Sequence, residues 1–373
     1  MKQIALLFLL TAVTALAQGN RADTLVSPDV HPDHRATFRI RAPKATEVTL
    51  GGDWLAQGAT LKMTRDEAGV WSATAGPFEP GISIYWFTVD GVTMADPINP
   101  RMKLRARTSA SLVDVPSNPP ELWQAREVPH GTVEINWEKS KVIGDTRAYY
   151  VYTPPGYDQK RSARYPVLYL LHGNNDTAAG WTDVGKANFI LDNLLAEKKA
   201  VPMIIVMPWG HALPYDGPQS NNTATVERYL LEDVIPQVEK KYRVADGRKN
   251  RVIVGLSMGG GHALQIGLSH LDLFSAVGAF SFAVPGNFET RFKTLLDDPK
   301  GTNAKLSLIW LGCGRQDPAF QRNRGISDLL TTHHIQNTFY ETDGPHNYVV
   351  WRRCLSEVAP LLFREKAKSK AAR

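Results

Sequence analysis

A serine flanked by glycines carries the clearest chemistry in this 373-residue chain. Ser257 is the centre of the sequence GLSMG at residues 255–259, which fits the pattern G-x-S-x-G. An apolar run at 252–254 precedes it, and a helical pattern follows at 260–269. On a sharp turn between a buried strand and a helix, a serine is held exposed in a strained backbone, and glycines leave room for the neighbouring chain. This context predicts that Ser257 is a nucleophile.

A nucleophilic serine needs a base and an orienting acid, which follow it in chain order in this topology. Asp317 comes after the apolar run 306–311, and His346 follows the next predicted strand, 337–341. Both positions lie at the carboxyl ends of strands, where open α/β sheets place their sites. We predict that Ser257 attacks, that His346 removes and returns its proton, and that Asp317 fixes the tautomer of His346.

Two other carboxylates could orient His346. Asp343 lies three residues before the histidine, and Glu341 lies at the end of the preceding strand. Neighbours within one loop seldom point at each other's ring nitrogen. We therefore favour Asp317 as the acid and keep Asp343 and Glu341 as alternatives.

Other histidines also lie near strand ends, namely His172, His211 and His262. We interpret each of them as a loop-packing or pocket residue and not as the base. The pair His333-His334 could suggest a metal site, but adjacent helical residues point apart, and no H-E-x-x-H or C-x-x-C motif accompanies them. The sequence therefore predicts neither a metal nor a cofactor.

The oxyanion of an acyl-transfer reaction needs hydrogen-bond donors. One donor should be the backbone N–H of Met258, which follows the nucleophile. We expect the second from the loop at 172–176, where the amide of Asn174 is the best candidate and Gly173 allows close approach. Gly173 is also assigned to the substrate pocket, together with Trp181, Trp209 and His211.

The elements that must position these residues form an α/β pattern. Short continuous apolar runs, typical of strands buried on both faces, occupy residues 167–171, 203–207, 252–254, 276–280 and 306–311. Amphipathic stretches such as 187–198 and 226–242 lie between them. Strands that alternate with helices indicate a mostly parallel, doubly wound sheet. We expect a doubly wound α/β domain over residues 127–365, and the family resemblance given below implies that it is an α/β hydrolase.

The first part of the chain has a different pattern. Alternating apolar and polar residues, broken by glycine and proline turns, predict a smaller all-β, immunoglobulin-like sandwich over residues 24–116. Three prolines at 116–120 indicate a stiff connection, and we place a linker at 117–126. The aromatic residues of the sandwich could either bind glycan or pack on the catalytic domain, and we favour packing. These residues are Trp54, Trp71, Tyr85 and Trp86.

Charge and cysteine content exclude several classes of protein. The chain has 43 basic and 37 acidic residues, a formal charge of +6, and no basic run interleaved with aromatic residues. Nucleic-acid binding is therefore not expected. Residues 366–373 form a basic tail. With only Cys313 and Cys354, the chain is no disulfide scaffold, although a single bridge between them stays open. The oligomeric state stays open as well.

The start of the chain has the features of an export signal. A positive start, Met1-Lys2, precedes an apolar run and a small-x-small sequence at 15–17. We predict a signal peptide at 1–17, a mature start near Gln18, and a secreted or periplasmic protein. The apolar run is shorter than the ~20 residues that span a bilayer, so no membrane span is expected.

At this point the sequence resembles a known family. The segments that carry the resemblance are 170–173, 180–181, 187–194, 206–208, 255–260 and 346–352. They look like the esterase-D-type α/β hydrolases of carbohydrate esterase family one, which include feruloyl and acetylxylan esterases. The family's nucleophile, acid and base fall on Ser257, Asp317 and His346. Asn174-Asn175 stands where relatives commonly have glycines, and Trp209 where asparagine is common.

The resemblance implies a serine carboxylesterase that acts on feruloyl or acetyl groups of plant cell-wall polysaccharide such as xylan. The front domain is similar to early-set sandwiches related to glycogen-binding modules. A siderophore esterase of the enterochelin type and a mycolyl-type acyltransferase are alternatives with the same triad. A carbohydrate-binding protein with an inert hydrolase domain is the alternative from another class.

Overall fold

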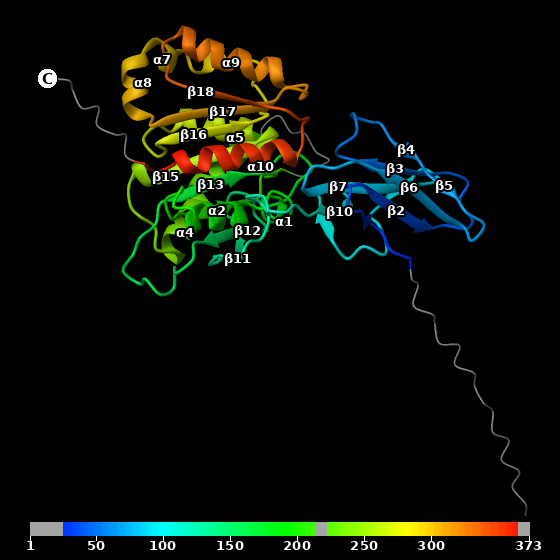
Figure 1. The fold of residues 1–373 in the computed structure, drawn as a ribbon. Helices are drawn as coiled ribbons and strands as arrows, with labels where there is room; N and C mark the ends of the chain where they lie inside the picture. Colours follow the sequence, from blue (N-terminus) through cyan, green and yellow to red (C-terminus); the bar gives the residue numbers. More distant parts are fainter. Residues whose placement is uncertain (1–24, 214–221, 365–373) are drawn as a thin grey trace, which may run out of the picture.

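The computed structural model describes residues 25–213 and 222–364. The expected signal peptide and the basic tail lie outside the described residues. Two regions of different character follow each other along the chain (Figure 1). We call residues 25–115 the N-terminal β region and residues 132–364 the α/β region. Residues 116–131 connect them and form neither a helix nor a strand.

The N-terminal β region consists of two sheets. One has the strand order β1-β2-β6-β5, and the other has the order β4-β3-β7-β10-β9 with β8 added to β7. Their inner faces share one apolar cluster that contains Phe38, Tyr85 and Phe87. The strands are β1 (Asp29–Val30), β2 (Ala36–Arg41), β3 (Val48–Gly52), β4 (Leu61–Lys62), β5 (Thr64–Arg65), β6 (Val70–Ala75), β7 (Gly81–Val89), β8 (Val92–Met94), β9 (Met102–Leu104) and β10 (Ser109–Val115).

An eight-stranded sheet forms the centre of the α/β region, in the order β11-β12-β14-β13-β15-β16-β17-β18. Strands β13 to β18 are parallel, and β11 and β12 form an antiparallel edge. The prediction of an α/β hydrolase with a mostly parallel sheet behind an all-β region is confirmed. The strands are β11 (Thr132–Lys139), β12 (Thr146–Thr153), β13 (Val167–Leu171), β14 (Ile204–Met207), β15 (Arg251–Leu256), β16 (Ala276–Phe280), β17 (Leu308–Gly314) and β18 (Thr338–Thr342).

Helices cover both faces of this sheet. Residues of α2 and α10 pack in the apolar cluster on one face, and residues of α4, α5 and α9 pack in the cluster on the other. A π-helical turn (Tyr229–Val234) joins α3 to α4. The helices are α1 (Gly180–Asp183), α2 (Ala187–Ala196), α3 (Asn222–Arg228), α4 (Ile235–Lys241), α5 (Ser257–Ser269), α6 (Phe288–Arg291), α7 (Lys293–Asp297), α8 (Pro299–Lys305), α9 (Phe320–Thr332) and α10 (Tyr348–Val358). None of the helices in the described ranges is long and apolar enough to cross a membrane.

The two regions share a packed interface. Ile82 and Ile84 of β7 belong to the same apolar cluster as α2 and α10. From α10, the buried Arg352 donates hydrogen bonds to the carbonyl of Ile82 at 2.9 Å and to the carbonyl of Val184 at 3.0 Å. The amide of Asn347 donates to a carbonyl of the N-terminal β region at 3.1 Å. The second sheet therefore packs against α10, next to the carboxyl ends of the central strands.

The aromatic residues of the N-terminal β region serve packing. Tyr85 and Trp71 are buried in the core between the sheets, and the ring of Trp54 stacks on Phe38. Trp86 is half-buried, with the guanidinium of Arg105 5.0 Å from its ring centre. These contacts lie within the N-terminal β region itself, so they do not show the expected packing on the catalytic domain. Both cysteines of the chain, Cys313 and Cys354, are buried free thiols.

Candidate active site

The backbone at Ser257 has the strained conformation that the glycine pattern predicts. Ser257 is the first residue of α5, directly after β15, and its φ of +52° lies in the left-handed region. A Cβ on Gly255 would lie 2.2 Å from the carbonyl oxygen of Gly259. A Cβ on Gly259 would lie 2.3 Å from the carbonyl oxygen of His172. Only glycine at both positions allows the turn to place Ser257 at the strand's end.

The structure brings Ser257, His346 and Asp317 into one hydrogen-bonded line. His346 Nε2 lies 2.9 Å from Ser257 Oγ, and His346 Nδ1 lies 2.8 Å from Asp317 Oδ2. Asp317 follows β17, and His346 follows β18, so three strands of one sheet end at this point. With Nδ1–H of His346 donating to the Asp317 carboxylate, Nε2 is free to accept the hydroxyl proton of Ser257.

The environment of Asp317 keeps its carboxylate ionised. Burial raises the pKa of Asp317. The hydrogen bond and charge of His346 and the N–H of Ala319 together lower it by more, so the pKa lies below its usual value. The Ala319 N–H donates to Asp317 Oδ1 at 2.8 Å. The ring of His346 packs edge-on against Trp351, with 5.1 Å between ring centres. These contacts fix the orientation of both side chains.

The alternative acids lie elsewhere. Asp343 pairs with Arg315, with Nη1 of the arginine 3.0 Å from Oδ1, and its side chain is 75% exposed. Glu341 forms ion pairs with Arg324 and Arg315. Neither carboxylate therefore has the position from which Asp317 contacts the ring of His346.

The loop after β13 approaches the serine closely. A Cβ on Gly173 would lie 3.1 Å from Cβ of Ser257, so this backbone passes directly beside that serine. Gly173 and Asn174 line the same cleft as Ser257. Met258 lies in the first turn of α5, where backbone N–H groups have no partner within the helix. These positions suit the two backbone donors that the sequence suggests.

Three of the residues assigned to the substrate pocket do not line this cleft. Trp181 is fully buried, and its Nε1–H donates to the carbonyl of Leu171 at 3.0 Å, so that this assignment is wrong. His211 is buried and Trp209 half-buried, both with their rings against His172. In the described part of the chain, Trp209 and His211 contact His172, and neither is among the residues that line the cleft at Ser257.

His172 joins two loops next to the site. Its Nδ1 lies 2.9 Å from the carbonyl oxygen of Gly173, and its Nε2 accepts from the N–H of Gly210 at 2.8 Å. Burial lowers the pKa of His172 and lowers that of His262 to about 3. Both rings are therefore neutral, as loop-packing residues should be. No cluster of metal-ligating side chains occurs in the part of the chain that the structure describes.

Sequence reasoning missed the opposite wall of the cleft. The cleft has a volume of about 450 Å³, and the N-terminal β region contributes to its lining. Burial raises the pKa of Asp53 to about 6, against the lowering effects of the Ile84 N–H and of three cations. No local pattern marks these residues, because they reach the cleft only when the two regions pack together. They are Asp53, Gln57, Ile84, Lys103 and Arg105.

A comparison with protein families shows to which family this chain belongs. Residues 140–362 match the model of the Esterase family, described as "Putative esterase". This match covers more than half of the chain, and the chain therefore belongs to the Esterase family. It is a carboxylic ester hydrolase.

The individual proteins to which the chain is similar include feruloyl esterases. The endo-1,4-beta-xylanase/feruloyl esterase of Xylanibacter ruminicola is 30% identical over 344 residues, which cover 90% of this chain and 46% of that protein. A CE1 ferulic acid esterase from Anaeromyces mucronatus, solved with ferulic acid, has 25% identity and a TM-score of 0.57 over 64% of this chain and 93% of its own. The chain spans about half or less of the length of the curated relatives that it matches first.

A further solved structure is similar over both regions. The enterobactin esterase of Shigella flexneri, solved with enterobactin, has a TM-score of 0.65 and 18% identity over 88% of this chain and 92% of its own. At this identity the similarity shows the fold alone.

Proposed function

We propose that this protein is an exported serine carboxylesterase that cleaves feruloyl or acetyl groups from plant cell-wall polysaccharide such as xylan. The observation that carries the proposal is the hydrogen-bonded line from Ser257 through His346 to Asp317 beside an open cleft. The similarity to a xylanase/feruloyl esterase over 90% of the chain supports the substrate class. That alignment necessarily includes most of the N-terminal β region.

The proposed mechanism proceeds through an acyl-enzyme. Ser257 Oγ attacks the ester carbonyl while His346 Nε2 takes the hydroxyl proton. The N–H groups of Met258 and Asn174 hold the oxyanion of the tetrahedral intermediate. As the intermediate collapses, the carbon–oxygen bond to the sugar breaks, and that oxygen takes the proton from His346. Water, with His346 again as base, then attacks the acyl-enzyme and releases the acid and free Ser257. Asp317 keeps the Nδ1 proton in place and stabilises the charged imidazole.

The size of the cleft suits the larger of the two acyl groups. A volume of about 450 Å³ is in the range of sites that hold drug-sized ligands, whereas an acetyl group would fill little of it. Leu256, Ile84 and Trp351 supply apolar lining for an aromatic ring. Asp53 and Gln57 supply polar groups for sugar hydroxyls.

A side-by-side assay tests this proposal. The purified protein is given methyl ferulate, acetylated xylan and a cyclic catecholate siderophore, with Ser257→Ala as the background control. We expect hydrolysis of methyl ferulate or acetylated xylan. A clear preference for the siderophore would instead assign the chain to the enterobactin esterases. Transfer of the acyl group to a sugar would indicate an acyltransferase, and no reaction at all would leave a carbohydrate-binding protein.

Export is tested separately, because it depends on residues outside the described part of the chain. The sequence at 1–17 has the features of a signal peptide. We expect mass spectrometry of the protein recovered from periplasm or medium to give an N-terminus near Gln18. A protein that keeps Met1 and stays in the cytoplasm would contradict export without affecting the esterase.

A further inference from the structure

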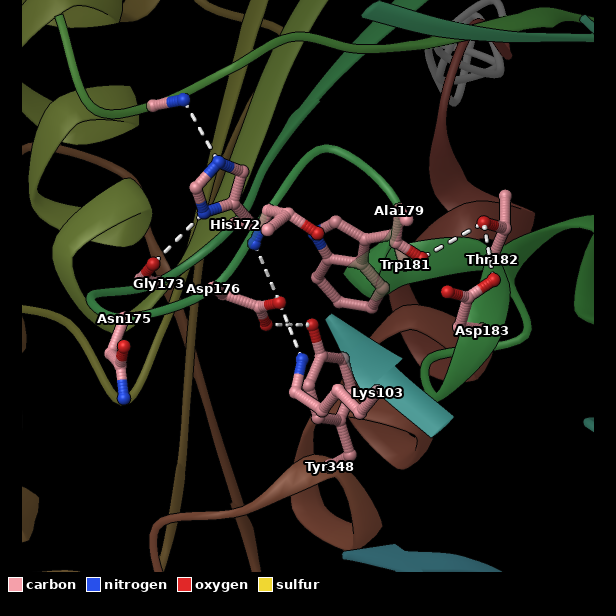
Figure 2. A network of polar contacts seen from close by, with 12 residues as sticks. Lys103, His172, Gly173, Asn175, Asp176, Ala179, Trp181, Thr182, Asp183 and Tyr348 are labelled. Atoms are coloured by element: carbon pink, nitrogen blue, oxygen red, sulfur yellow. Dashed lines mark hydrogen bonds and ion pairs between the residues drawn. The ribbon is translucent and has the colours of Figure 1, made fainter. Parts of the chain in front are cut away.

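One buried carboxylate connects three parts of the cleft (Figure 2). Asp176 lies on the loop after β13 and is 5% exposed. Its Oδ1 accepts hydrogen bonds from Nζ of Lys103 and from the Thr177 N–H, and its Oδ2 accepts from the hydroxyl of Tyr348 at 2.6 Å. Lys103 belongs to β9 of the N-terminal β region, and Tyr348 begins α10, two residues after His346.

The segment after β9 also holds the residue before Asp176. The N–H of Ala106 donates to the carbonyl of Asn175 at 3.5 Å, and the N–H of Arg107 donates to Oδ1 of Asn175 at 3.3 Å. Asn175 has a φ of +56°, a left-handed conformation that its surroundings must hold. The N-terminal β region thus fixes Asn175 and Asp176 from outside.

The other end of the same loop is fixed from inside. Gly173 lies against Ser257, and its carbonyl lies within hydrogen-bond distance of the His172 ring. The N–H of Asn174 is the proposed second oxyanion donor. Asn174 therefore lies between Gly173, which the α/β region fixes, and a pair of residues, Asn175 and Asp176, to whose fixing the N-terminal β region contributes. The position of its N–H depends on both.

An ion pair is a poor way to gain stability at this place. Lys103 and Asp176 are both about 95% buried, and the cost of removing two charges from water roughly cancels their attraction. Apolar side chains of the same size would stabilise the interface at least as well. The pair and the Tyr348 hydroxyl instead fix directions, because each hydrogen bond restricts the carboxylate.

We propose that Lys103 is a positioning residue, which through Asp176 holds the loop that presents the Asn174 N–H to the oxyanion. The inference rests on the proposed function, because it requires the acyl-transfer reaction at Ser257. It assigns the N-terminal β region a part in the chemical step, in addition to any contact with substrate.

The expected effect follows from the sensitivity of an oxyanion hole to geometry. Loss of one donor lowers kcat by about 100- to 1,000-fold, and a displacement of about 1 Å costs about 100-fold. Lys103→Met leaves the loop folded but removes the hydrogen bond of the ammonium to Asp176. We therefore expect kcat for methyl ferulate to fall about 10- to 100-fold, with KM changed less than about threefold.

The test compares four full-length variants. Lys103→Met removes the ammonium, Lys103→Arg keeps the charge, and Asp176→Asn keeps most hydrogen bonds. Arg101→Met is the matched control, because Arg101 lies next to β9 and loses only an exposed ion pair with Asp114. Each variant is measured for kcat, KM, melting temperature and affinity for phenylboronic acid, which forms a tetrahedral adduct with an active serine. Titration of active sites corrects kcat for inactive protein.

We expect Lys103→Met to lower kcat and boronate affinity together, Lys103→Arg to restore part of both, and Arg101→Met to stay within about twofold of the parent. If Lys103→Met folds poorly, Asp176→Asn carries the test, because its amide oxygen can still accept from the Lys103 ammonium, which loses only its counter-ion, and it should lower kcat in the same way. A lower melting temperature with unchanged kcat in both variants would overturn the inference. A raised KM with unchanged kcat would do so too, since Lys103 would then contact substrate directly.

Ser257→Ala separates this inference from the proposed function. If Ser257→Ala keeps its activity, the proposed reaction itself is wrong. If Ser257→Ala is inactive while Lys103→Met and Asp176→Asn are fully active, the reaction stands and only the role of Lys103 fails.

Discussion

The two walls of the cleft arise from the sequence in different ways. Ser257, Asp317 and His346 follow β15, β17 and β18 of one parallel sheet, whose carboxyl ends meet at one edge. The opposite wall comes from turns and strand ends of the N-terminal β region, including Asp53 and Lys103. Topology alone brings the first set together, and we call it the first wall. The second set, which we call the second wall, reaches the site only through packing between residues far apart in the chain.

The comparisons with known proteins divide along the same line. The Esterase family match covers residues 140–362, which include the first wall only. The alignment with the Xylanibacter ruminicola protein extends over 90% of the chain and so includes most of the second wall. One hydrolase fold serves many substrates. The first wall therefore relates to the reaction, whereas the second can distinguish one ester from another.

The largest effect is expected at the first wall. Ser257→Ala removes the proposed nucleophile, and we expect kcat for methyl ferulate to fall by at least about 10,000-fold. The melting temperature should stay nearly unchanged, because alanine is similar in size and the glycines still allow the turn. Ser269→Ala, at the exposed end of the same helix, is the control. A Ser257→Ala protein with normal hydrolysis would place the nucleophile elsewhere.

A smaller loss is expected from the orienting acid. Asp317→Asn should favour the wrong tautomer of His346 and lower kcat about 1,000- to 10,000-fold, by analogy with the serine-protease triad. Asp343→Asn should have almost no effect, because Asp343 pairs with Arg315 at the surface. Steady-state kinetics of both variants decide the assignment. A crippled Asp343→Asn beside a mild Asp317→Asn would reverse it.

Removal of the second wall tests directly whether both walls are needed for activity. A chain that begins at Glu121 keeps the first wall but leaves Arg352 without the Ile82 carbonyl and Asp176 without Lys103. We expect a lower melting temperature and at least about a tenfold loss of activity on methyl ferulate as well as on xylan. Loss confined to insoluble cell wall would make the N-terminal β region an attached glycan-binding module. Full activity on both substrates would mean that it contributes to neither.

The sequence predicts that Ser257, Asp317 and His346 lie together because the signals for these positions are local. A strand, a G-x-S-x-G turn and a helix identify Ser257, and the next strand ends indicate Asp317 and His346. The pocket assignment of Trp181 is wrong because its place in the sequence does not show which way the ring points. In the structure, its indole N–H satisfies the carbonyl of Leu171 inside the core.

The second wall could not be predicted, for a physical reason. Asp53 and Lys103 are polar residues in or near short strands of an all-β region, where such residues usually face water. Their burial arises from an interface with the α/β region, and no spacing in the sequence encodes that interface. Lys103, for example, meets a carboxylate 73 positions away.

The smallest effect concerns the burial of this second wall, and it is a change of stability with pH. Burial against the α/β region raises the pKa of Asp53 from 3.8 to about 6, so the folded protein binds an extra proton between these values. The contribution of Asp53 to the free energy of unfolding is therefore fully present below about pH 4 and falls as the pH rises toward 6. Asp53→Asn should remove this loss, because an amide resembles the neutral acid and still accepts the Ile84 N–H.

Urea unfolding of the parent and of Asp53→Asn from pH 3.5 to 7.5 measures this difference. We expect the two free energies of unfolding to agree near pH 3.5 and Asp53→Asn to be more stable by about 1 kcal/mol at pH 7, after allowance for partial exposure. Asp272→Asn, an exposed carboxylate of the α/β region, should follow the parent at every pH. A constant difference between the parent and Asp53→Asn across this range would show that the carboxyl of Asp53 is solvated. The second wall would then be an open surface of the N-terminal β region, and not a wall closed by its packing on α10.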